Sequence, residues 1–292
     1  MTASVLRREP TSWGVRLVLD RPDKLNAISH ELREALAAAI ADAAVDPAIR
    51  VIAIAGEGRA FCAGYDLAEG APTTALGWHE VLARDVAVSL AIWRCPKPVI
   101  AQVHGYCLAG GLELAMACDL IVCADDAQLG EPEIRFGSAP VTLLMPYLLG
   151  QKKTRELLFT GDLVDASEAL RIGLVNRVVP RASLAAEVDA LADRLARVEP
   201  DVMAPTKRML NRAMEAAGFL EAVESGLDLQ SFINVSASSQ EFNAIVASSG
   251  LKAALAWRDR RYDERLADSA GRGAPAPARD AGSDAQSVDP EA

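Results

Sequence analysis

The sequence predicts an α/β protein, because short strand-like runs alternate with longer helical stretches along most of its 292 residues. Val15–Leu19 alternates between apolar and polar residues, as a half-buried strand does. Val51–Ala55 and Val99–Val103 are short apolar runs rich in β-branched residues, which favour buried strands. Helical patterns follow each of these runs, and this alternation defines the α/β class.

The composition, with 51% hydrophobic and 24% charged residues, is typical of a globular protein that buries a large core. No apolar run approaches the ~20 residues that span a bilayer. The first ten residues, MTASVLRREP, lack the apolar segment of a secretory signal. The net charge of −10 argues against a nucleic-acid partner. We therefore expect a cytoplasmic protein with neither a membrane nor a nucleic-acid partner.

The cysteines favour a reducing compartment. None of the five belongs to a CxxC pair, and most lie in apolar runs, which indicates buried thiols rather than disulfides. The three histidines do not have the spacing of metal ligands, so we expect no metal site. The cysteines are Cys62, Cys95, Cys107, Cys118 and Cys123.

The first helix has clear boundaries. A polar turn over residues 20–27 follows the first strand, and Ser29 can cap a helix over His30–Val45. Glu31 is favourable in its first turn, and Asp46-Pro47 ends it.

The central stretch, VIAQVHGYCLAGGLELAMACDLIVC over residues 99–123, reads as strand, turn, helix and strand. Gly110 and Gly111 open the helix, so no side chain keeps a ligand away from the backbone there. The first N–H groups of a helix have no partner within it and favour an anionic oxygen. Glu113 follows in the first turn, and a carboxylate beside oxyanion donors suits chemistry at a carbonyl.

This stretch resembles the signature of the enoyl-CoA hydratase/isomerase (crotonase) family. The resemblance rests on Ile100–Gly105, on Ala109–Gly111 and on Leu112–Leu120, and it extends from about Val15 to Tyr262. It implies a crotonase-like spiral of ββα units, the fold of the Clp protease/crotonase superfamily, with a C-terminal helical trimerisation region.

The expected organisation has three parts. Residues 1–198 form the spiral core with the active site, and residues 199–266 form the helical oligomerisation region. Residues 267–292 are mainly Ala, Gly, Pro, Asp and Ser without periodicity, and we expect a disordered tail there. The resemblance implies a homotrimer or a dimer of trimers.

The resemblance also implies the chemistry. The backbone N–H groups of Tyr65 and Gly110 would hold a thioester oxygen, and Glu113 and Glu133 would act as acid and base. Glu133 lies in a Pro-Glu pair twenty residues after Glu113, which matches the two-glutamate hydratases of the family. Coenzyme A would be part of the substrate, with no other cofactor. Residues 70–92 would cover the acyl end, and the substrate-binding positions would be Lys24, Ala27, Ala63, Tyr65, Asp66, Leu67, Gly110, Pro132 and Val141.

One position departs from the family pattern. Val141 stands where the family usually has a glycine whose backbone helps to place a water molecule. A β-branched residue resists a positive φ, so the loop either takes a different path or keeps its donor at negative φ.

The expected activity is hydration of a 2-enoyl-CoA. Val141 and Tyr65 keep open an enoyl-CoA isomerase and an acyl-CoA hydrolase or lyase. A non-catalytic acyl-CoA binder or trimeric scaffold is a third alternative, against which the presence of both glutamates argues. A Clp-type serine protease is excluded, because the start of the central helix has no serine.

Overall fold

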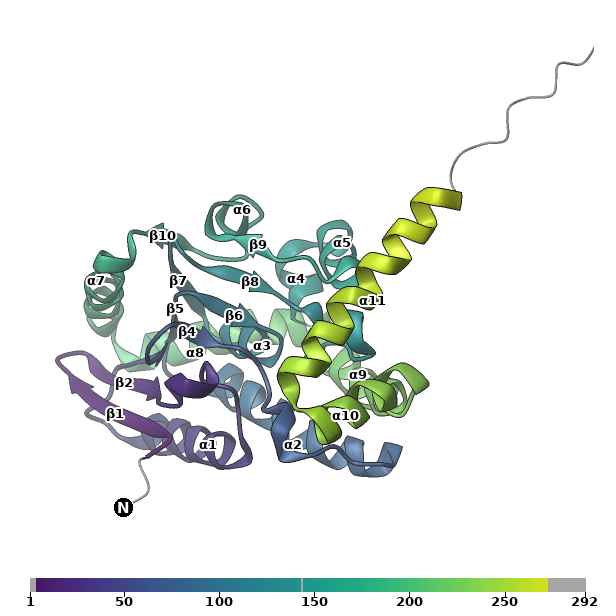
Figure 1. Cartoon of the computed structure of the whole chain (residues 1–292). Coiled ribbons are helices and arrows are strands. Elements are labelled where there is room, and N and C mark those ends of the chain that lie inside the picture. The colour runs from purple at the N-terminus through teal and green to yellow at the C-terminus, as the bar shows by residue number, and fades with distance from the viewer. Residues whose placement is uncertain (1–3, 143, 273–292) are drawn as a thin grey trace, which may run out of the picture.

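The computed structural model describes residues 4–142 and 144–272, which form two sheets with helices packed around them (Figure 1). The strands are β1 (Leu6–Thr11), β2 (Gly14–Leu19), β3 (Val51–Gly56), β4 (Ala60–Cys62), β5 (Val99–Val103), β6 (Tyr106–Leu108), β7 (Leu120–Ala124), β8 (Gln128–Gly130), β9 (Val164–Asp165) and β10 (Arg177–Val179). The helices are α1 (His30–Val45), α2 (Ala75–Arg94), α3 (Gly110–Ala117), α4 (Met145–Leu149), α5 (Gln151–Thr160), α6 (Ala166–Arg171), α7 (Leu184–Ala196), α8 (Pro200–Ala216), α9 (Phe219–Ile233), α10 (Ala237–Ser249) and α11 (Leu251–Arg272).

The chain winds as a spiral between the two sheets. The larger sheet has the order β1-β2-β3-β5-β7-β10, and the smaller one has the order β4-β6-β8-β9. Each of β3, β5 and β7 in the larger sheet is followed by a short strand of the smaller sheet, namely β4, β6 and β8. Helix α2 follows the first of these pairs and α3 the second, so the expected ββα spiral is confirmed.

The two faces of the larger sheet are buried differently. Helix α7 covers one face, where Val188 and Leu184 pack with Trp13, Val51 and other buried residues (Figure 1). The other face belongs to the main core, which includes α1 and α3. All eight residues of α3 are buried, which fixes the helix that carries Glu113.

The first helix is confirmed at both ends. Helix α1 covers His30–Val45, and the Ser29 side chain accepts a hydrogen bond from Leu32 N–H at 3.2 Å. The C-terminal region differs from expectation. Helix α10 lies within the region expected to be helical, but α11 continues to Arg272, so the expected disordered tail begins too early. The stretch Asp263–Ala270 is rich in residues with adequate helix propensity, which explains the extension. Residues 273–292 lie outside the described part of the chain.

The C-terminal helices cover the loop that carries Glu133, a 3-10 turn over Pro132–Phe136 called η3. Phe136 stacks on Phe242 of α10 with ring centroids 4.5 Å apart, and Arg135 lies over the ring of Tyr262 in α11. Within residues 4–142 and 144–272, no helix combines the length and apolarity needed to cross a membrane.

Candidate active site

Two glycine turns meet at the start of α3. Gly64 has a φ of +97°, and a Cβ on it would lie 2.7 Å from the Ala109 Cβ and 3.4 Å from the Gly110 nitrogen. Only glycine fits this position, because an L side chain is strained at that φ and would also overlap Ala109. The contact brings the backbone around Tyr65 next to the N-terminus of α3, as the sequence predicted.

Each turn presents one unused backbone donor. On either side of Tyr65, the Gly64 carbonyl accepts from Ile28 N–H at 2.8 Å, and Asp66 N–H donates to the Ile28 carbonyl at 3.0 Å. These bonds fix the peptide groups around the Tyr65 N–H. Gly110 is the first residue of α3, so its N–H has no acceptor in the helix. Neither N–H donates to an acceptor within the described residues.

Arg21 links the turn that contains Tyr65 to the turn over residues 20–27. Its Nη2 lies 2.7 Å from Asp66 Oδ2, and its Nη1 donates to the Ala27 carbonyl. The ion pair is largely enclosed, with side-chain exposed fractions of 18% for Arg21 and 9% for Asp66. The guanidinium therefore holds the residue after Tyr65 in place through a charge-assisted bond.

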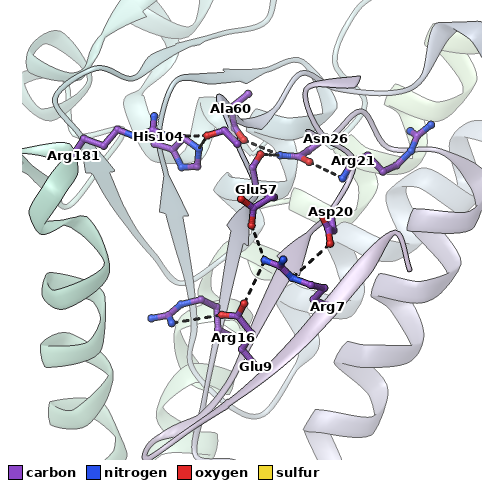
Figure 2. Close-up of polar contacts among 11 residues, drawn as sticks. Arg7, Glu9, Arg16, Asp20, Arg21, Asn26, Glu57, Ala60, His104 and Arg181 are labelled. Atoms are coloured by element: carbon purple, nitrogen blue, oxygen red, sulfur yellow. Dashed lines mark hydrogen bonds and ion pairs between the residues drawn. The ribbon is translucent and has the colours of Figure 1, made fainter. Parts of the chain in front are cut away.

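Asn26 links Arg21 to the chain around Glu57 and Ala60, as Figure 2 shows. Its side-chain amide donates to the carbonyls of Glu57 and Ala60, both at 2.8 Å, and its Oδ1 accepts from Arg21 N–H at 2.9 Å. Asn26 is fully buried and has a left-handed φ of 55°, which asparagine adopts more readily than most residues. The sequence predicted a polar turn here but did not indicate this network.

Glu113 is held by the loop that contains Val141. The carboxyl is only 2% exposed, and its Oε1 accepts from Val141 N–H at 2.8 Å and from Thr142 N–H. Val141 is not among the residues with positive φ, so the loop keeps its donor at negative φ. Burial raises the pKa of Glu113 above its ordinary value, while the two backbone donors oppose that rise.

Glu133 lies in η3 with one carboxyl oxygen unpartnered. It is 8% exposed, and its Oε2 has no hydrogen-bond partner within the described residues. Burial raises the pKa of Glu133 to about 8, and the charge of Glu113 adds to the rise. The two carboxyl groups are thus near enough to influence each other, and Glu133 holds its proton at neutral pH.

Glu131 is a third buried acid, which the sequence reasoning missed. It is 2% exposed, and neither carboxyl oxygen has a partner within the described residues. Burial raises its pKa well above the usual range, and the charges of Glu133 and Glu113 add to this effect. The only sequence signal is a second glutamate on the other side of Pro132, which also fits an exposed turn.

The Tyr65 ring lies across the N-terminus of α3. A Cβ on Gly110 would be 2.3 Å from Tyr65 Cε2, so the ring occupies the space that any other residue would need. Burial raises the pKa of the Tyr65 phenol well above its ordinary value, and the charges of Asp85 and Glu113 raise it further. The phenol therefore stays neutral beside the catalytic candidates.

A buried ion pair lies between the first two helices, and the sequence reasoning missed it too. Arg33 of α1 donates from Nη1 to Asp85 Oδ1 of α2 at 2.8 Å. Burial raises the pKa of Asp85 to about 6, Arg33 opposes this, and the charge of Glu113 raises it further. A helical arginine usually lies on a solvated face, so only the packing of α1 on α2 identifies this one.

The remaining predicted substrate-binding positions surround these two turns. Ala63 N–H donates to the Leu25 carbonyl at 3.0 Å, which joins the turns once more. Lys24 is exposed on the first turn, Leu67 follows Asp66 at the start of a 3-10 turn, and Pro132 opens η3. The two turns therefore lie together. Glu133 of η3 is near enough to Glu113 for the charge of Glu113 to raise its pKa.

Comparison with known proteins agrees with this arrangement. The enoyl-CoA hydratase/isomerase family model matches residues 14–246. A putative enoyl-CoA hydratase of Thermus thermophilus is 38% identical over 197 residues, which cover 66% of this chain and 78% of that protein. A crotonyl-CoA hydratase of Syntrophomonas wolfei is 38% identical over 183 residues, covering 61% and 70%. The crystal structure of an enoyl-CoA hydratase/isomerase from Xanthobacter autotrophicus Py2 has a TM-score of 0.86 at 38% identity, covering 89% of this chain and 99% of that one. The chain therefore belongs to the enoyl-CoA hydratase/isomerase family.

Proposed function

We propose that the protein is an enoyl-CoA hydratase, which adds water reversibly across the C2=C3 bond of a 2-enoyl-CoA thioester. The observation that carries the proposal is the contrast between the two glutamates. Glu113 is anchored by two loop N–H groups, whereas Glu133 is buried with an unpartnered oxygen and a raised pKa. Hydration needs one base and one acid, and this contrast supplies both.

The thioester oxygen binds between the N–H groups of Tyr65 and Gly110. Attack at C3 moves negative charge onto this oxygen, so donors aimed at it stabilise the transition state more than the substrate. The dipole of α3 adds to the effect, because the Gly110 N–H is at its positive end. Removing one such donor costs about 2.7–4 kcal/mol in a well-studied protease, so this pair is the largest single contribution to expect.

The two carboxyl groups then divide the proton transfers. Glu113, held through Oε1, acts as the base and accepts a proton from a water molecule whose oxygen bonds to C3. Glu133, which is protonated at neutral pH, donates its proton to C2 as the enolate collapses. One water molecule is thereby added, and both glutamates exchange their protonation states. The proposed steps need no cofactor besides coenzyme A, which is part of the substrate.

The pair of acids favours hydration over isomerisation. The Val141 N–H donates to Glu113 Oε1 at 2.8 Å, so the loop holds in place the carboxylate that the proposed hydration uses as its base. An isomerase moves a proton with one carboxylate and has no need of a second acid. Relatives named enoyl-CoA hydratase and crotonyl-CoA hydratase add support.

The trimer or dimer of trimers implied by the resemblance remains part of the proposal. Several large apolar side chains are exposed on the C-terminal helices, as expected for a surface that associates. They include Met209, Leu210, Leu229, Phe232 and Ile233. Light scattering coupled to gel filtration would give the mass, and a monomer would contradict this part. The proposed cytoplasmic location is supported by five buried free cysteines.

The deciding experiment follows crotonyl-CoA in H₂¹⁸O. Hydration removes the absorbance of the conjugated thioester and places ¹⁸O in the product, whereas isomerisation of a 3-enoyl-CoA adds no oxygen. We expect ¹⁸O-labelled 3-hydroxyacyl-CoA. Folded protein that hydrates no 2-enoyl-CoA of any chain length would refute the proposal.

A further inference from the structure

The ion pair between Arg33 and Asp85 joins α1 to α2. Both belong to helices that pack on each other, and only 5% and 6% of their side-chain surfaces are exposed. Asp85 is on α2, which lies within the region expected to cover the acyl group. Replacing a buried ion pair by apolar residues is often neutral or stabilising. A contribution to stability is therefore not a sufficient reason for this pair to be buried here.

One polar atom of this pair lacks a partner. The buried Arg33 Nε–H donates to no acceptor within the described residues, and Asp85 is bonded to Arg33 through Oδ1 alone. The Trp78 Nε1–H, two turns away on α2, also has no acceptor among those residues. Trp78 precedes Asp85 by seven residues on α2, so both are on one face of that helix. Leaving a buried donor unsatisfied is destabilising, and native proteins keep such groups where a ligand or a water molecule meets them.

The pair is close to the reacting groups. Burial raises the pKa of Asp85, and the charge of Glu113 raises it further. The charge of Asp85 raises the pKa of the Tyr65 phenol, and that of Arg33 lowers it. Tyr65 in turn covers Gly110, where the thioester oxygen would bind. The pair is therefore near enough to Glu113 and to the Tyr65 ring for the charges of these groups to affect one another.

The charges select the chemical class of the group that meets them. Arg33 and Asp85 neutralise each other, while Glu113 and Glu69 add negative charge nearby. A carboxylate on the acyl chain would be repelled, and an ammonium group could not satisfy an N–H donor. A hydroxyl can accept from the Arg33 Nε–H and donate to Asp85 Oδ2 at the same time.

We propose that the Arg33–Asp85 pair is a recognition site for a hydroxyl group on the acyl chain, so that the preferred substrates are hydroxylated 2-enoyl-CoA thioesters. This inference rests on the proposed hydratase function. A methyl group in place of the hydroxyl leaves the donor and the acceptor unsatisfied, and sites built to bond a hydroxyl discriminate strongly against its absence.

The test compares substrates that differ only in a terminal OH or CH₃. The pairs are 5-hydroxypent-2-enoyl-CoA with hex-2-enoyl-CoA, and 6-hydroxyhex-2-enoyl-CoA with hept-2-enoyl-CoA, with crotonyl-CoA as reference. For at least one pair we expect the wild-type kcat/KM to favour the hydroxyl by about tenfold or more. In the Arg33→Met/Asp85→Leu double variant this ratio should fall to about one or below. The ratio cancels any general loss of activity.

Lys207→Met provides the matched control. Lys207 Nζ lies 2.7 Å from Asp119 Oδ2, and its side chain is 7% exposed, so the variant breaks another enclosed ion pair. Its substrate ratio should equal that of the wild type.

The outcomes separate the two proposals. Hydration of crotonyl-CoA without preference in either substrate pair would overturn the hydroxyl site and leave the hydratase intact, even if the double variant does not fold. A preference that persists in the double variant would show that other residues recognise the hydroxyl. No hydration of any substrate would overturn the hydratase function itself.

Discussion

Replacing Gly110 by alanine tests the oxyanion site most directly. The added Cβ would lie 2.3 Å from Tyr65 Cε2, 2.7 Å from Cδ2 and 2.8 Å from Cζ. Gly110 is not among the glycines with positive φ, so its backbone accommodates alanine. The Tyr65 ring is therefore the obstacle, and it has to move when the methyl group is present.

The expected decrease in kcat depends on which backbone donor is displaced when the Tyr65 ring moves. Tyr65 supplies one of the two N–H donors, and hydrogen bonds on both sides of it hold its backbone tightly. Displacing the ring disturbs that donor or the Gly110 N–H. Loss of one oxyanion donor lowers kcat by about 10²–10³-fold, which is about 2.7–4 kcal/mol. We expect a decrease of this size in Gly110→Ala, with the fold retained.

A second substitution separates the ring from the backbone. Tyr65→Ala keeps the N–H of residue 65 but removes the ring, so Gly110→Ala/Tyr65→Ala should recover most of the lost kcat. Gly111→Ala is the matched control, because its Cβ would meet the Cys62 carbonyl oxygen at 2.5 Å. Tyr65→Ala should not rescue that variant, since a backbone atom is in the way.

The assay is steady-state hydration of crotonyl-CoA, with circular dichroism and the melting temperature as checks on folding. The reasoning fails if Gly110→Ala keeps kcat within a few-fold of wild type. It also fails if the double variant is no faster than Gly110→Ala while both remain folded.

Four further predictions concern Glu133 and Arg21. Glu133→Gln should lower kcat for hydration by at least about 10²-fold, the usual contribution of a positioned acid, and a rate near wild type would exclude Glu133 as that acid. The wild-type kcat should fall as pH rises through about 8, where Glu133 loses its proton; a flat profile up to pH 10 would contradict this. Because the folded-state pKa is raised above 4.5, the wild type loses stability between about pH 4.5 and 8. The melting temperature of Glu133→Gln minus that of the wild type should therefore be larger at pH 9 than at pH 5. Equal differences at the two pH values would count against this. Arg21→Met should lower kcat by about 10–100-fold with Arg21→Lys retaining more of it. It should also weaken the near-ultraviolet enolate band of bound acetoacetyl-CoA, and an unchanged band would rule out a positioning role.

Helices and turns were predictable where they depend on residues that are close in the sequence. Ser29 caps a helix because its hydroxyl reaches an N–H three residues on, and the helix His30–Val45 follows from its composition and from Pro47. Gly110 and Glu113 share one helical turn, so the spacing alone places an acid beside free N–H groups. The predicted disordered tail began too early because helix propensity continues beyond the last apolar residues.

The sequence by itself determined the family through its resemblance, and it determined the strands Val15–Leu19, Val51–Ala55 and Val99–Val103 through short-range patterns. The resemblance also pointed to the two turns that we propose as the source of the oxyanion donors. Only the tertiary structure decided that Val141 keeps its N–H on Glu113, that Glu131 is buried, and that Arg33 meets Asp85. The last two residues are 52 positions apart in the chain. Their pairing depends on how α1 packs on α2, and no local pattern records whether a charged side chain turns toward the core or toward water.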